Sequence, residues 1–188
     1  MKIKEKGTFG YIRQHQILSV LRTVLLFVLA LGLYFIGYTR TGSNKNLLTV
    51  IAVLGLLPAS KSMVNMIMFL RFRSLKKEEH DEYEQHRKEL PILYENVLTT
   101  SQQAYYLPAL ICSDNMICSF CESTGDLKML EAQIKEALNQ DGRDTGVKIF
   151  QDKRLFMKRL EEVVKNTEQK TPDPDVQSIF NVIKAISL

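Results

Sequence analysis

Several signatures of enzymes and of disulfide-stabilised proteins are missing from this sequence. Cysteine is scarce: the 188 residues contain three, an odd number that does not suit a disulfide framework. No glycine-rich phosphate loop precedes a helix, because Gly7 and Gly10 lie in the basic N-terminal segment. No Ser–His–Asp or Cys–His set is arranged, since His15 lies in that same segment and His80 and His86 lie in one polar stretch. We therefore expect no cofactor and favour a binding role over catalysis.

The sequence also lacks a stripe of basic residues that would follow a nucleic acid. The formal net charge is +4, and the C-terminal half mixes both signs, so we expect no nucleic-acid partner. Basic residues instead flank two long apolar runs, a position that indicates membrane orientation. We predict headgroup contacts for Lys2, Lys4, Lys6 and Arg13 before the first run, and for Arg71, Arg73, Lys76 and Lys77 after the second. The alternative for residues 1–16 is an ordinary basic cytosolic arm.

The two apolar runs are the main positive feature. The first, Ile17–Tyr38, carries one charge, Arg22, and is long enough as a helix to cross a hydrocarbon core of about 30 Å. The second extends from Leu47 to about Leu70 after a short polar turn. A secretory signal is disfavoured because no small-x-small cleavage site follows the first run. Residues 17–72 are thus predicted to form an antiparallel transmembrane hairpin.

The basic residues also set the expected orientation of this hairpin. The turn between the runs holds only Arg40 and Lys45, whereas more basic residues flank the open end. The positive-inside bias then places both termini in the cytoplasm and the hairpin in the cell membrane. Membrane lipids are therefore the first expected partners.

Pro58, Lys61 and Asn65 interrupt the second run, and Lys61 and Asn65 share one helical face. An isolated charge at the bilayer centre costs about 2.5–3.5 kcal/mol. In one interpretation, Lys61 snorkels along its stem to the cytoplasmic headgroups and Pro58 kinks the helix. In the other, the three residues form an intramembrane polar face that meets a carboxylate or a phosphate. Because the first run contains no acidic residue, such a group would belong to a lipid, another subunit or another protein.

A cytosolic α/β (α+β) domain is predicted after the hairpin. Residues 73–91 are polar and rich in helix formers, which is typical of a solvated helical stalk. Residues 92–188 should form a small mixed sheet covered by helices, with strands at 95–102, 104–112, 116–122 and 146–150. Amphipathic helices follow Asp126 and Asp152, which we expect to act as N-caps.

The cysteines lie within these strands. Asp114 and Asn115 tolerate positive φ and predict a tight hairpin turn. In that register Cys112 pairs with Ile117, and the three cysteines, including Cys121, spread over both faces of the sheet. We therefore predict small buried side chains and no metal site.

The order of elements resembles, in topology only, the core of PD-(D/E)xK nucleases. The resemblance implies a metal-dependent nuclease in which Asp114 supplies the first acid, and Asp126 and Lys128 supply the acid-x-Lys pair. The sequence departs from the family's pattern, because Asp114 falls in a turn and Asp126 opens a helix where the family has a strand.

These features favour an integral membrane protein whose hairpin holds a cytosolic interaction or regulatory domain at the membrane. A homo-oligomer or a larger membrane-protein partner would supply contacts for Lys61 and Asn65. The alternatives are a membrane-anchored, metal-dependent nuclease-like enzyme and a small channel or transporter subunit that uses the Lys61 and Asn65 face.

Overall fold

The computed structural model describes residues 4–43, 46–113, 115–123, 125–167 and 175–188. The chain divides into two compact units. One is a helical hairpin, Ile12–Arg73; the other joins the N-terminal residues through Tyr11 to Ser74–Leu188. The residues that precede the hairpin are therefore part of the folded domain.

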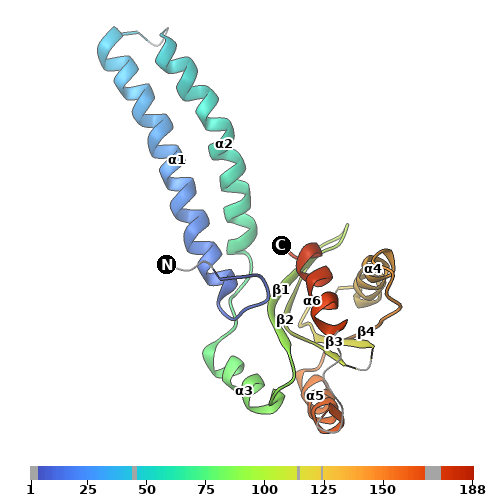
Figure 1. Ribbon diagram of the computed structural model, residues 1–188. Coiled ribbons are helices and arrows are strands. Elements are labelled where there is room, and N and C mark those ends of the chain that lie inside the picture. Colours follow the sequence, from blue (N-terminus) through green and yellow to red (C-terminus); the bar gives the residue numbers. More distant parts are fainter. Residues whose placement is uncertain (1–3, 44–45, 114, 124, 168–174) are drawn as a thin grey trace. The chain divides into compact units, whose positions relative to one another are not determined.

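The hairpin consists of two long antiparallel helices, α1 (Tyr11–Thr41) and α2 (Leu47–Leu70) (Figure 1). The bounds of α2 match the second apolar run, and α1 begins before the first. Asn46 caps α2, since its Oδ1 accepts a hydrogen bond from the backbone N–H of Thr49 at 2.8 Å. Pro58 lies inside α2, and helical structure continues on both sides of it.

The two helices pack through a seam of small residues. The least exposed positions of each helix recur with the alternating spacing of three and four residues that defines a heptad. The small residues among them are Ser19, Thr23, Ala30 and Gly37 in α1, and Ala52, Gly55, Ala59 and Ser62 in α2. A Cβ built on Gly55 would lie 3.8 Å from the Cβ of Ala30. Small side chains thus allow the two backbones to approach closely, as they do between transmembrane helices.

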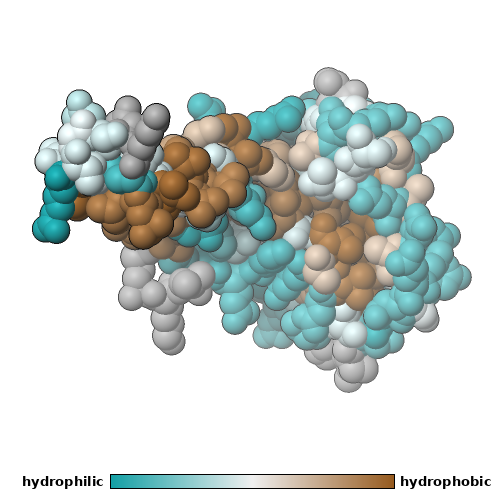
Figure 2. All heavy atoms as spheres, turned by 90° about the horizontal axis from the view of Figure 1, so that it is seen from above, coloured by the Kyte–Doolittle hydropathy of each residue, from teal (hydrophilic) through white to brown (hydrophobic). Residues whose placement is uncertain are grey.

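Large apolar side chains of the hairpin point outward. Among the described residues, all the large exposed hydrophobic side chains lie in α1 and α2 except Met116 and Leu155. Figure 2 shows brown surface over the two helices and a second brown area over the domain. By length and composition, both helices could cross a membrane. A surface of this kind is rare on soluble monomers.

The domain is built on a four-stranded mixed sheet in the order β1-β2-β3-β4. The strands are β1 (Ile92–Thr99), β2 (Ala104–Ser113), β3 (Met116–Phe120) and β4 (Gly146–Phe150). The first three are antiparallel and β4 is parallel to β3, which confirms the predicted mixed sheet. Helices α4 (Leu127–Gln140) and α6 (Asp175–Ile186) cover one face, whereas α3 (Lys77–Arg87) and α5 (Lys153–Thr167) lie on the other (Figure 1).

The register of the β2–β3 hairpin is the predicted one. Cys112 pairs with Ile117, and Asn115 has a φ of 60° at the turn, whereas Asp114 lies outside the described residues. Cys112 and Cys121 belong to the core on the α4 and α6 side, and Cys118 belongs to the opposite core. All three thiols are buried, and the alternation of side chains along paired strands places Cys112 and Cys118 on opposite faces of the sheet.

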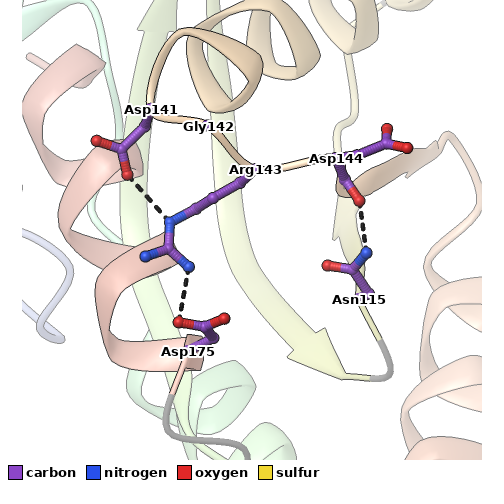
Figure 3. A pocket seen from close by; sticks show the side chains of 6 residues that line it. All are labelled: Asn115, Asp141, Gly142, Arg143, Asp144 and Asp175. Carbon is purple, nitrogen blue, oxygen red and sulfur yellow. Dashed lines mark hydrogen bonds and ion pairs between the residues drawn. The ribbon is translucent and has the colours of Figure 1, made fainter.

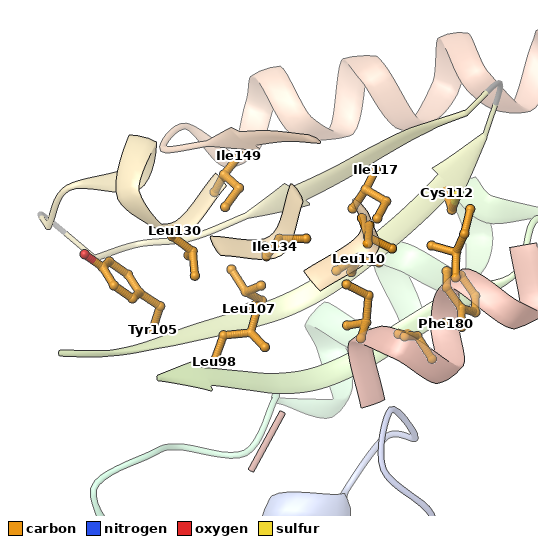
Figure 4. Close-up of a cluster of buried hydrophobic side chains, with 14 of the residues drawn as sticks. Leu98, Tyr105, Leu107, Leu110, Cys112, Ile117, Leu130, Ile134, Ile149 and Phe180 are labelled. Carbon is orange, nitrogen blue, oxygen red and sulfur yellow. The ribbon is translucent and has the colours of Figure 1, made fainter. Parts of the chain in front are cut away.

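Two hydrophobic cores fill the space between the sheet and its helices. The larger one packs Leu107, Leu110 and Ile117 of the sheet against Leu130 and Ile134 of α4, among others (Figure 4). The smaller one is centred on Phe156 of α5. These side chains are almost wholly shielded from solvent.

The first strand differs from its prediction. It begins at Ile92, directly after Pro91, and ends at Thr99, whereas we expected residues 95–102. The pairing of β1 with β2 omits Glu95 and Pro108, between the pairs Tyr94–Ala109 and Asn96–Leu107. Glu95 has a φ of 53°, and proline has no N–H to donate to the ladder. The alternation of faces therefore breaks near Glu95, since Leu93 and Leu98 belong to the same core. The strand was predicted from β-branched and aromatic residues, which do not mark where the pairing with β2 begins.

The predicted stalk is a helix, but it is not solvated all round. Tyr83 of α3 is only 1% exposed and its ring packs edge-on against Phe156, with centroids 6.1 Å apart. Lys153 of α5 donates a hydrogen bond to Glu82 at 2.7 Å. The polar composition of residues 73–91 suggested a solvated stalk, whereas α3 contacts α5 through Tyr83 and Glu82.

Candidate functional site

A polar cluster crosses the seam of the hairpin. The hydroxyls of Thr23 and Ser62 lie 2.8 Å apart, and both residues are buried. Arg22 Nε donates a hydrogen bond to Ser62 Oγ at 3.2 Å. The guanidinium of Arg22 is thereby held against α2 rather than left to rotate freely.

Lys61, Asn65 and Pro58 lie on the same flank of the hairpin as Arg22. If the buried positions are taken as a and d of heptads, Arg22, Pro58 and Asn65 occupy g positions and Lys61 occupies the adjacent c position. In an antiparallel pair of helices, g positions face g positions across the seam. Lys61 and Pro58 are exposed and Asn65 is half-buried. The structure therefore adds Arg22 of α1 to the predicted polar face of α2.

The two cations of this flank lie at similar heights along the hairpin. The contact between Thr23 and Ser62 shows that these two residues lie at the same height along the hairpin axis. Because the helices are antiparallel, Arg22 is then at the height of Met63, and Lys61 is at the height of Val24. At a rise of 1.5 Å per residue, the Cα atoms of Arg22 and Lys61 differ in height by about 3 Å. Both lie about 8–10 Å inside the level of Ile17, where the first apolar run begins.

No acidic residue occurs anywhere from Ile12 to Arg73. Within the described part of the chain, no partner is present for Lys61 Nζ, for the side-chain amide of Asn65 or for the two terminal nitrogens of Arg22. Polar groups in an apolar medium are strongly destabilising unless they are hydrogen-bonded. This flank, which we call the cationic flank (Arg22, Pro58, Lys61 and Asn65), therefore presents N–H donors that have no acceptor among the described residues.

The other basic candidates fall into two groups. Lys6 Nζ donates to the backbone oxygen of Ser187 at 2.7 Å, at the end of α6, so it stabilises a helix C-terminus. Lys4 donates to the backbone oxygen of Phe9, and its ammonium lies 5.4 Å from the centre of the Phe9 ring. Lys2 lies outside the described residues. The side chains with exposed positions near the open end of the hairpin are Arg13, Arg71, Arg73, Lys76 and Lys77.

A buried carboxylate marks the start of the domain after the hairpin. Glu95, 2% exposed, accepts hydrogen bonds from Ser74 Oγ and from the backbone N–H of Leu75, the latter at 3.0 Å. The nearby Tyr106 hydroxyl is buried, and this burial, followed by the charge of Glu95, raises the pKa of Tyr106. Glu95 thus joins strand β1 to the first residues that follow Arg73.

A polar depression of about 370 Å³ lies where α4 ends, α6 begins and the β2–β3 turn approaches β4 (Figure 3). Arg143 occupies it, donating to Asp141 at 3.0 Å, to Asp175 at 2.9 Å and to Ser178 at 2.7 Å. Asn115 donates to the backbone oxygen of Asp144. Hydrogen bonds to Asp175 and then to Asp141 raise the pKa of Arg143. These side chains form hydrogen bonds and ion pairs with one another, and those of Arg143 connect the end of α4 to the start of α6. The depression is therefore a structural junction.

The residues proposed by the nuclease resemblance are placed as follows. Asp126 is the N-cap of α4, and its Oδ1 accepts from the backbone N–H groups of Lys128 at 3.0 Å and Met129 at 3.3 Å. Lys128 follows in the first turn of the helix, and Asp114 lies outside the described residues. In the described part of the chain, no group of three His, Cys, Asp or Glu side chains is arranged to hold a metal ion.

Sequence reasoning missed Arg22 and Ser62 as members of the candidate site. Arg22 was noted as the single charge near the start of an apolar run, and Ser62 was not singled out. The available signal was the heptad spacing of small residues in both runs, which marks the face through which each helix packs but not which residues lie opposite each other.

Comparisons of this chain with protein-family models, with curated proteins and with solved structures give no match. The candidate function therefore depends on the geometry of the chain itself.

Proposed function

We propose that this protein is a membrane-tethered interaction domain, with α1 and α2 crossing the cell membrane and the α/β domain in the cytosol. The observation that supports this is the distribution of exposed apolar side chains. They surround the hairpin and, among the described residues, are almost absent from the domain. Acyl chains are the solvent that suits such a surface.

The seam supports the same assignment. In water, two helices associate by burying their large apolar residues, which gives an amphipathic pattern. Here Ala52, Ala59 and Ser62 are the buried residues of α2, and large side chains such as Leu54 and Leu57 face outward. This arrangement is the reverse of a soluble helical pair and is typical of helices packed in lipid.

The contents of the domain support a binding role rather than catalysis. The space between the sheet and its helices is filled by hydrophobic side chains (Figure 4). The depression of Figure 3 is occupied by Arg143 and its partners. The outer surface of the domain is then the part available to a partner, whether a second copy of the chain or a larger membrane protein.

Cysteine labelling tests both the tether and its orientation. Ser43→Cys places a thiol in the turn of the hairpin, and Lys158→Cys places one on the exposed face of α5. The native cysteines are at most 2% exposed, so their background reaction should be small. In intact bacterial cells expressing the chain, a membrane-impermeant maleimide should label Ser43→Cys, and should label Lys158→Cys only after permeabilisation.

Two results would contradict this proposal. Recovery of the unmodified chain in the soluble fraction without detergent would remove the membrane assignment. Labelling of Lys158→Cys in intact cells would reverse the orientation. Mass measurement of the chain in a gentle detergent would then show whether it is monomeric, self-associated or bound to a larger partner.

A further inference from the structure

We infer that the cationic flank of the hairpin binds the phosphate of an anionic lipid in the cytoplasmic leaflet. This inference rests on the proposed function, because it requires the hairpin to lie in a bilayer with its open end at the cytoplasmic face. It goes beyond the general expectation of lipid contacts because it names the ligand, an anionic lipid phosphate, and the site, the cationic flank.

The first argument is charge balance. Arg22 and Lys61 lie at similar heights on one flank, and residues 12–73 contain no carboxylate that could neutralise either. Two cations on one flank of the hairpin repel each other in a medium of low dielectric. An anion placed between them converts this repulsion into attraction, and only a molecule outside the hairpin can provide it.

The second argument is hydrogen-bond chemistry. Arg22 Nε donates to Ser62 Oγ, and the two terminal nitrogens of Arg22 have no acceptor among the described residues. A guanidinium, an ammonium and a carboxamide together offer several N–H donors, and a phosphodiester offers acceptor oxygens with a negative charge. The donor set therefore matches a phosphate better than it matches a neutral headgroup.

The third argument is depth. In an α-helix the Cα–Cβ bonds tilt toward the N-terminus. The N-terminus of α1 is at the open end of the hairpin, so the Arg22 side chain can snorkel in that direction. The same rule tilts Lys61 of α2 toward the turn, away from the cytoplasmic face. The Lys61 side chain is therefore poorly placed to reach the cytoplasmic headgroups by snorkelling. A lipid phosphate drawn inward by local thinning would meet both cations at about 8–10 Å depth.

Native mass spectrometry of the full chain in a non-ionic detergent tests this inference. The purified protein is mixed with equal amounts of phosphatidylglycerol and phosphatidylcholine, and the retained lipid is counted. We expect the wild-type chain to retain phosphatidylglycerol preferentially. Arg22→Gln and Lys61→Gln should each lower this preference about fivefold, and the double variant should abolish it. Lys61→Arg should retain it.

Arg40→Gln is the matched control. It removes one positive charge at the end of α1 next to the turn, far from the cationic flank, and it should leave the preference unchanged. The helical circular dichroism of every variant is measured, so that loss of folding is recognised. Arg22→Lys keeps the charge at this position if Arg22→Gln does not fold.

The inference would be overturned by equal retention of the two lipids, or by an equal loss with Arg40→Gln. It would also be overturned if inorganic phosphate, at the lipid's concentration, displaced phosphatidylglycerol, because the ligand would then be a free anion. If the cysteine labelling gave the expected pattern but the lipid preference were absent, the membrane tether would stand and only the lipid site would be rejected.

Discussion

The hairpin and the domain use the same apolar residue types in opposite ways. In the domain, Leu107, Leu110 and Phe156 are fully buried, whereas in the hairpin Leu21, Leu57 and Phe35 are more than half exposed. The domain follows the rule of a protein folded in water. The hairpin instead buries its small residues and exposes its large ones. Under the proposed function, the acyl chains of the membrane cover these exposed side chains.

The two units are alike in how they satisfy their buried polar groups. Across the hairpin seam, Thr23 and Ser62 satisfy each other. In the domain, Glu95 is buried in the sheet and is satisfied by Ser74 and Leu75. Each unit therefore contains an internal polar contact that specifies how its elements join, and the predictions below perturb one unit while the other serves as the reference.

Alkaline pH should produce the largest difference between the two units. Burial is the main factor that raises the pKa of Tyr83, Tyr94 and Tyr106 above the ordinary value of 10.0. Because these hydroxyls ionise more readily in the unfolded chain, domain stability should be intact below about pH 10 and should fall as the pH rises further. Tyrosinate absorbance should therefore rise together with domain unfolding. A rise in absorbance without unfolding would contradict this.

Truncation of one phenylalanine in each unit compares their cores directly. Phe156 is 0% exposed and Phe35 is 61% exposed. Phe156→Ala should lower the free energy of unfolding of the domain by about 3–5 kcal/mol. Phe35→Ala in detergent should change the stability of the hairpin by less than about 0.5 kcal/mol. Urea denaturation of the full chain in detergent, followed by circular dichroism, measures both. Equal effects would remove the contrast on which this comparison rests.

Glu95 provides a test of the internal polar contact of the domain. Glu95→Ala removes the acceptor for Ser74 Oγ and for the Leu75 N–H, and should destabilise the domain by about 2–3 kcal/mol. Glu95→Gln keeps one oxygen acceptor and should cost less. Thermal unfolding of the two variants measures the difference. If Glu95→Gln and Glu95→Ala were equally destabilising, the charge and not the hydrogen-bond geometry would be the important property.

Local signals allowed much of the fold to be predicted from the sequence. The bounds of α2 follow from an apolar run that begins after a capping asparagine, Asn46. The β2–β3 register follows from Asn115, which adopts positive φ at the turn. Asp126 and Asp152 cap their helices as expected, since each accepts a backbone N–H of the first turn. These features depend on residues close together in the chain.

What could not be predicted depends on residues far apart in the chain. Docking of α3 requires Tyr83 to meet Phe156, and composition alone does not show that contact. The irregularity at Glu95 is set by Pro108 of the neighbouring strand. Arg22 joins the cationic flank only because Ser62 lies opposite it. Such pairings follow from packing, which single-chain periodicity does not specify.

The close approach of α1 and α2 should be sensitive to a single methyl group. A Cβ at Gly37 would lie 2.8 Å from Asn46 Oδ1 and 2.9 Å from Leu48 Cβ, whereas a Cβ at Gly32 would have no neighbour within 4 Å. Gly37→Ala should therefore destabilise the hairpin by about 1–2 kcal/mol. Gly32→Ala, the matched control on the same helix, should be neutral or stabilising. Thermal unfolding in detergent measures both, and equal behaviour would mean that the seam is not tightly packed.

Arg143 should give the smallest effect, because its ion pairs are partly open to water. It connects the end of α4 to the start of α6 through Asp141 and Asp175, whose side chains are 49% and 67% exposed. Such pairs contribute little to stability, so Arg143→Ala should lower domain stability only slightly at low salt. Because salt screens exposed charges, the difference from wild type should shrink at high ionic strength. Arg154→Ala, which removes a 91% exposed side chain paired only locally with Asp152, is the control and should change stability less. If Arg143→Ala instead left stability unchanged but abolished the binding of a partner, the depression of Figure 3 would be a recognition site and not a structural junction.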